Sequence, residues 1–160
     1  MRKIIAAFII IVTFILGFLF FFKKSVAPPQ QREVQMEPET VNFEASFAIF
    51  TNGLFRDFSA SMYHNLSPHA YIQSGEPNKV QVRKKGVTWN DFFKTLPFKL
   101  TKECLTTGLG ETFCTGQGGS LKFYLNGERN DNVLDEVIHS GDSILISFGN
   151  ENEAQIKEQM

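Results

Sequence analysis

The stretch GVTWNDFFKTLP, residues 86–97, is the clearest helix in the sequence. Thr88 can accept hydrogen bonds from the free N–H groups of the first turn, and Asp91 stands three residues later, as in a capping box. Apolar residues follow at the helical spacing i, i+3, i+4 and i+7: Trp89, Phe92, Phe93 and Leu96. Pro97 ends the pattern, since proline cannot continue a helix. The stretch therefore predicts one amphipathic helix with a single apolar stripe.

Short strands and turns precede this helix. In FEASFAIF, residues 43–50, alternation places one set of apolar side chains on a single face of a strand: Phe43, Ala45, Phe47 and Ile49. Asn52 and Gly53 follow, and this dipeptide favours a tight hairpin turn. LFRDF, residues 54–58, is expected to return as the partner strand.

A second hairpin is predicted over residues 70–83, where AYIQ and KVQVR flank the turn GEPN. Its second strand alternates, so Val80 and Val82 are expected to face the core. The residues between them are expected to face water: Lys79, Gln81 and Arg83.

After the helix, the pattern predicts strands at 100–106, 112–115, 121–125 and 143–148, with a short helix or turn at 133–138. The fold class is therefore α+β, a compact and mostly antiparallel β domain with one amphipathic helix.

The N-terminal segment from Ile4 to Phe22 holds 19 residues without a charge. As a helix it would span about 28 Å, close to the hydrocarbon thickness of a bilayer. A cleaved signal peptide would have a shorter apolar region and small residues at the cut, which SVA at 25–27 offers poorly. A buried core helix would not be apolar on every face. The segment therefore predicts an uncleaved, single-pass transmembrane anchor whose partner is the lipid bilayer.

The chain is thus divided into four parts: a cytoplasmic N-terminus and anchor (1–24), a proline-containing flexible stalk (25–40), an α+β domain (41–149) and a polar, disordered tail (150–160). Its formal net charge of −1 offers no basis for a nucleic-acid partner.

The two cysteines, Cys104 and Cys114, bound the stretch CLTTGLGETFC. Folding this stretch about Leu109 places them opposite each other in an antiparallel pair, within disulfide range. A disulfide there would stabilise the domain by roughly 2–3 kcal/mol. Two free thiols, a redox pair or half a metal site are the alternatives, although no C-x-x-C occurs and the histidine spacing matches no zinc motif.

A structural disulfide also indicates an oxidising compartment. Charge at the two flanks of the anchor favours a cytoplasmic N-terminus only slightly, with Arg2 and Lys3 on one side and Lys23 and Lys24 on the other. Together the two observations predict a cell-membrane protein whose C-terminal domain is extracytoplasmic.

Five stretches carry a resemblance to a known family: FAIFTNG, GVTWNDFFKTLP, CLTTGLGETFC, LKFYLNGERND and VIHSGDSILISFGNE. In order and spacing, over about residues 44–151, they resemble an uncharacterised family of membrane-anchored, extracytoplasmic proteins of archaea and little-cultured bacteria. Some relatives are labelled protein-disulfide isomerase, but this chain has no C-x-x-C. The closing half also resembles a β-grasp module, which implies binding more than catalysis.

Members of that family often carry H-x-H pairs, which implies metal binding in those relatives. The matching positions here are Asn42 and Glu44, then Gln81 and Arg83, and none is histidine. The resemblance therefore implies that this chain has lost the metal ligands, and we assign it no metal and no cofactor.

The remaining candidates for binding are His64, His69, Lys79 and Arg83. Histidines can act as acid, base or ligand, and the basic run KVQVRKK could dock an acidic partner or lipid headgroups. Plain surface roles are the alternative for all four. No G-x-S-x-G, P-loop or dinucleotide motif is present.

The sequence thus favours a membrane-anchored extracytoplasmic binding or assembly module without an evident catalytic site, which binds an unidentified protein or small molecule. A thiol/disulfide redox protein using Cys104 and Cys114 is one alternative. A metal-binding domain, as implied for the histidine-bearing relatives, is the other.

Overall fold

The computed structural model describes residues 39–160. The predicted cytoplasmic N-terminus, the anchor from Ile4 to Phe22 and nearly all of the stalk lie outside the described residues. Between residues 39 and 160, no helix is long and apolar enough to cross a membrane. Residues 39–160 belong to one compact unit.

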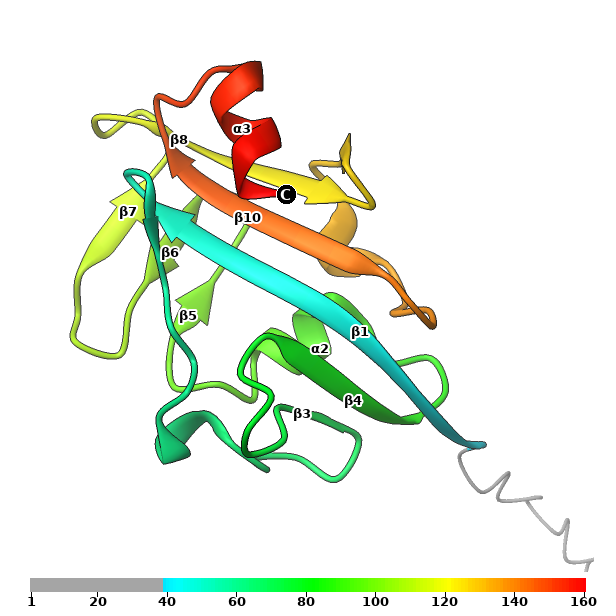
Figure 1. The fold of residues 1–160 in the computed structure, drawn as a ribbon. Helices are drawn as coiled ribbons and strands as arrows, with labels where there is room; N and C mark the ends of the chain where they lie inside the picture. Colours follow the sequence, from blue (N-terminus) through cyan, green and yellow to red (C-terminus); the bar gives the residue numbers. More distant parts are fainter. Residues whose placement is uncertain (1–38) are drawn as a thin grey trace, which may run out of the picture. The chain divides into compact units, whose positions relative to one another are not determined.

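The larger sheet has seven strands, and two strands from opposite ends of the described chain lie side by side at its centre (Figure 1). The strand order is β3-β4-β1-β10-β8-β9, and β2 pairs with the end of β1. The bounds are β1 (Thr40–Thr51), β2 (Leu54–Phe55), β3 (Ala70–Tyr71), β4 (Lys79–Lys84), β8 (Ser120–Leu125), β9 (Glu128–Arg129) and β10 (Ser143–Gly149).

The central pair, β1 and β10, is parallel, with Ser46 opposite Ser143 and Thr51 opposite Phe148. All other pairs between these named strands are antiparallel. The fold is therefore α+β and mostly antiparallel, as predicted.

The helix predicted at 86–97 is present as α2 (Trp89–Phe93), and its capping box is formed as expected. The Thr88 hydroxyl accepts from the Asp91 N–H at 3.1 Å, and the Asp91 carboxylate accepts from the Thr88 N–H at 3.1 Å. After Lys94 the backbone turns more tightly, because the N–H groups of Thr95 and Leu96 bond three residues back rather than four. The helix is thus shorter than its apolar stripe.

The main core lies between α2 and one face of the larger sheet. The predicted stripe is buried in full: Trp89, Phe92, Phe93 and Leu96. Phe47 of β1 meets the rings of Phe92 and Phe93 edge-on, with centroids 5.5 and 5.9 Å apart. The alternation expected for β1 is confirmed, since Ala45, Phe47 and Ile49 are buried and Phe43 packs at their margin.

The opposite face of the sheet carries a second, smaller core beneath α3 (Glu153–Gln159). Ile156 of α3 is 1% exposed and packs with Tyr124 and Leu145. The structure therefore differs from the disordered tail expected at 150–160. Asn152 caps the helix through hydrogen bonds from the N–H groups of Ala154 and Gln155, and burial of Ile156 holds it on the sheet.

A second sheet has three strands in the order β5 (Lys99–Leu100), β6 (Cys104–Thr106) and β7 (Thr112–Cys114). The single strand predicted over 100–106 is wrong, because a turn divides it into β5 and β6. The Thr101 hydroxyl accepts hydrogen bonds from the N–H groups of Cys104 (2.9 Å) and Glu103 (3.3 Å), which closes that turn.

Two Asn-Gly turns behave as their sequence predicts. Asn52 and Gly53 have φ angles of 52° and 75°, and Asn126 and Gly127 have φ angles of 52° and 83°. The first turn returns only as the short β2, after which the chain leaves the sheet and forms the 3₁₀ turn η1 (Ser61–Tyr63). The segment predicted at 133–138 contains a second such turn, η2 (Val133–Asp135).

Candidate binding pocket beside the disulfide hairpin

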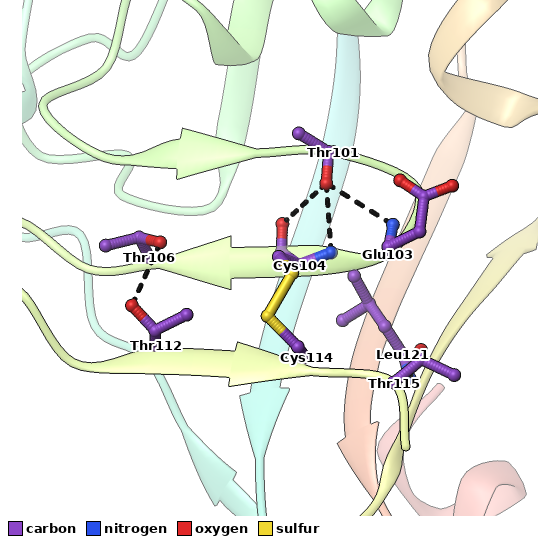
Figure 2. The surroundings of a disulfide bond; sticks show 8 residues. All are labelled: Thr101, Glu103, Cys104, Thr106, Thr112, Cys114, Thr115 and Leu121. Carbon is purple, nitrogen blue, oxygen red and sulfur yellow. Dashed lines mark hydrogen bonds between the residues drawn. A yellow bond between two sulfur atoms is a disulfide. The ribbon is translucent and has the colours of Figure 1, made fainter. Parts of the chain in front are cut away.

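Cys104 and Cys114 form a disulfide between β6 and β7, in the register that the sequence predicts (Figure 2). Their Cα atoms are 4.2 Å apart. Backbone hydrogen bonds at Thr115–Glu103 and Thr107–Glu111 place the cysteines at a non-hydrogen-bonded pair, the closer of the two antiparallel pair types. The two cysteines are therefore joined, and the described residues contain no free cysteine.

The tip of this hairpin is held against the rest of the domain by its backbone. A Cβ atom added to Gly108 would lie 2.7 Å from the Pro97 carbonyl oxygen, so only glycine allows the two segments to approach this closely. The next residue, Leu109, is 93% exposed. The hairpin thus presents a leucine to solvent at the end of a braced loop.

A pocket of about 410 Å³ opens beside this tip. Its walls come from the end of β1, from the chain after β2 and from the disulfide hairpin. They are mostly apolar and rich in aromatic residues: Ile49, Phe55, Phe58, Tyr63, Phe98 and Leu105. Cavities of this size and lining are typical of small-molecule and side-chain binding sites.

Three large apolar side chains surround the mouth of the pocket. Phe55, Met62 and Leu109 are 44, 54 and 93% exposed, and all three line the pocket. Single exposed apolar residues are common on proteins, whereas a group of them around one cavity indicates a contact surface.

Charged groups converge on the same pocket. Arg56 donates a 2.6 Å hydrogen bond from Nε to the Thr51 hydroxyl, and its guanidinium lies over the Phe113 ring at 5.3 Å. Its Nη1 approaches the Glu111 carboxylate only to 3.5 Å, and both side chains are part-exposed. This pair is long and solvated, so it contributes little to stability and both groups can engage another partner.

Asp57 is the second carboxylate of the pocket. The hydroxyl and the N–H of Ser59 both donate hydrogen bonds to it, and these hold the pKa of Asp57 below its usual value. The pocket therefore combines an apolar interior with one guanidinium and two carboxylates at neutral pH.

Of the predicted binding residues, His64 and His69 belong to no group of side chains in residues 39–160 that could hold a metal ion. A ring nitrogen of His64 lies 3.1 Å from the Phe58 carbonyl oxygen, behind the pocket wall. His69 lines a separate hollow with Asp91 and Thr95. Across residues 39–160, no group of three or more His, Cys, Asp or Glu side chains is placed to hold a metal ion.

Lys79 and Arg83 are engaged within the domain. Lys79 pairs with Glu76 at 3.0 Å and with Glu44 at 3.1 Å, and the hydrogen bond to Glu76, followed by that to Glu44, raises the pKa of Lys79. Arg83 lies over the Tyr71 ring at 5.8 Å and donates to the Gln81 side chain at 3.3 Å. Both side chains thus make contacts within the domain.

The prediction that Gln81 of β4 faces water is wrong, because its side chain is buried. Its amide donates to Glu44 at 2.7 Å and to Glu76 at 3.2 Å. Charged neighbours thus satisfy the buried amide, and two of them, Glu44 and Glu76, lie outside β4, so the alternation of that strand could not reveal the burial. Val80 and Val82 are buried as predicted.

The binding residues predicted from the sequence did not include those that line the pocket, such as Phe55, Arg56, Met62, Leu109 and Glu111. The available signal was Leu109, an apolar residue between two glycines at the tip of a hairpin. Comparison with known proteins adds no further assignment, because no protein-family model, curated protein or solved structure matches the chain.

Proposed function

We propose that this chain is a membrane-anchored, extracytoplasmic binding or assembly module that holds an apolar group of its partner in the pocket beside the disulfide hairpin. The observation that carries the proposal is the pocket itself, with exposed Phe55, Met62 and Leu109 around its mouth. Burying such side chains against a partner is favourable by about 25 cal/mol per Å² of apolar surface.

The strand order supports a β-grasp-like interpretation of the domain. Its central strands β1 and β10 are parallel, antiparallel partners β4 and β8 flank them, and α2 covers one face. Such a likeness bears on fold alone, and the site must carry the function. The disulfide is consistent with an oxidising compartment, and the apolar segment from Ile4 to Phe22 supports the anchor.

The pocket can be tested with the neutral dye Nile red, whose fluorescence rises in apolar surroundings. The full chain in a mild detergent, compared with detergent alone, should show saturable binding. Met62→Glu places a charge at the mouth of the pocket and should weaken binding at least about 10-fold. Leu66→Glu is the matched control, since Leu66 is 45% exposed in the same loop but does not line the pocket. Equal loss in both variants, or no saturable binding, would contradict the proposed site.

The membrane arrangement has its own test. Protease added to intact cells should digest the domain while the N-terminus stays protected, and a protected domain would reverse the proposed orientation. If the purified chain turned over any substrate, the proposal of a non-enzymatic binding module would be wrong.

A further inference from the structure

We infer that the partner seated in this pocket is a second copy of the chain, and that in the resulting two-fold dimer Leu109 of each copy enters the pocket of the other. This inference rests on the proposed function, because it names the partner of the same site. Three features carry it: a braced apolar projection, a cavity beside it, and charges of both signs on one rim.

The projection is preorganised. The disulfide closes the hairpin ten residues apart, Gly108 packs on the Pro97 carbonyl, and the Gly110 N–H donates to the Thr107 carbonyl at 2.9 Å. Because the loop is already ordered, little conformational entropy is lost when its tip is buried. Leu109, at 93% exposure, is the side chain that this loop presents.

The cavity lies next to the projection, and Leu109 itself belongs to its wall. A two-fold interface requires each copy to offer both a projection and its complement on the same patch, so that residue i meets residue j and j meets i. A projection and a cavity that adjoin each other satisfy this condition, with the symmetry axis between them.

The charges are also self-complementary. Arg56 and Glu111 occupy the same rim at 3.5 Å, with side chains 32 and 55% exposed. Around a two-fold axis, Arg56 of each copy can face Glu111 of the other, and exchanging solvent contact for two such pairs gives specificity to an apolar interface. An anionic lipid surface fits less well, because Asp57 and Glu111 both line the pocket.

Charge exchange tests the pairing directly. Arg56→Glu leaves two carboxylates facing each other across the axis, and Glu111→Arg leaves two guanidinium groups facing each other. Each single variant should lose self-association in sedimentation velocity of the full chain in neutral detergent. An equimolar mixture of the two should form a heterodimer, and the double variant R56E/E111R should recover the homodimer.

The projection is tested in the same experiment. Leu109→Ser should raise the dimer dissociation constant at least about 10-fold. Leu54→Ser is the matched control, since Leu54 is 70% exposed but does not line the pocket, and should change the constant less than about twofold. Leu109→Ser, Leu54→Ser and Glu111→Arg change exposed side chains and should keep the thermal unfolding of the unmodified chain. Arg56→Glu also removes the hydrogen bond to Thr51 and should lower the unfolding temperature, so the heterodimer with Glu111→Arg is the readout that separates pairing from stability.

Several results would overturn the inference. These are a chain that stays monomeric up to about 1 mM, charge variants that associate as the unmodified chain does, and a mixture that forms no heterodimer. If the chain is monomeric and phosphatidylcholine vesicles slow hydrogen exchange at the Leu109 amide, the surface binds lipid instead. Nile red separates the two proposals: a monomer that still binds the dye keeps the pocket and loses only the second copy.

Discussion

Gln81 and Glu44 stand directly opposite each other on β4 and β1, and the Gln81 amide donates a 2.7 Å hydrogen bond to the Glu44 carboxylate. This bond, followed by that from Lys79, holds the pKa of Glu44 below its usual value. The structure thus brings two residues that lie 37 positions apart in the sequence into one cross-strand pair of a carboxylate and an amide.

This geometry predicts that a metal site can be built on the pair. Side chains at directly opposed positions have Cβ atoms about 4.5–5.5 Å apart, which suits two imidazoles on one ion. The variant E44H/Q81H should bind Cu²⁺ or Zn²⁺ at least about 10-fold more tightly than E44H alone, measured by titration calorimetry. The unmodified chain should bind neither ion stoichiometrically in equilibrium dialysis. If the unmodified chain binds one of these ions stoichiometrically, the alternative function of a metal-binding domain would be favoured.

Reduction of the disulfide should lower the free energy of unfolding by about 2–3 kcal/mol, because the bond closes a short loop and restricts the unfolded chain. Guanidinium titrations of the oxidised and reduced protein measure this difference. The double variant C104S/C114S should have the same unfolding free energy as the reduced protein, and reductant should not change it. A bond that cycles at a mild potential without loss of stability would instead favour the redox alternative.

The capping box of α2 should make stability depend on acid pH. Hydrogen bonds from Thr88 lower the pKa of Asp91 from its ordinary value of 3.8. The ionised carboxylate therefore stabilises the fold above pH 3.8, and this contribution disappears as the pH falls through the lowered pKa. Asp91→Asn should be less stable than the unmodified chain at pH 7, and the two should converge at low pH.

Thr88→Ala removes the other half of the box and should cost about 1 kcal/mol of unfolding free energy at neutral pH. The loss of unfolding free energy in Thr88→Ala should persist at acid pH more than the loss in Asp91→Asn, since a hydroxyl does not titrate. A pH-independent difference for Asp91→Asn would contradict this account of the cap.

Ile156 should anchor the C-terminal helix. Ile156→Ala should cost about 2–4 kcal/mol, because the side chain is fully buried against Tyr124 and Leu145. Glu158→Ala, on the exposed side of α3, is the matched control and should change stability by less than about 0.5 kcal/mol. Hydrogen exchange of α3 amides provides a second readout, and rapid exchange in the unmodified chain would show that the helix does not dock.

Several features were predictable because residues close in sequence produce them. The Thr88–Asp91 cap, the Asn-Gly turns and the alternation of β1 each depend on a few neighbouring residues. The pairing of Cys104 with Cys114 belongs to this group as well, since the nine residues between them fold back symmetrically about Leu109.

Other features depend on partners far along the chain. Burial of Gln81 requires Glu44, 37 residues away, to accept its hydrogen bond. Docking of α3 requires the sheet face that Leu145 and Tyr124 build. In the sequence alone, an amide between two valines and a single isoleucine among polar residues look like solvent-exposed positions.

The sequence by itself determined the α+β class, the helix and its cap, the hairpin turns and the disulfide register, because short-range sterics and hydrogen bonding decide them. Only the tertiary structure decided the parallel pairing of β1 with β10 and the second core under α3. It also decided the pocket, where Arg56 and Glu111, 55 residues apart, share a rim. Packing between distant segments creates such a surface, and no local pattern encodes where those segments meet.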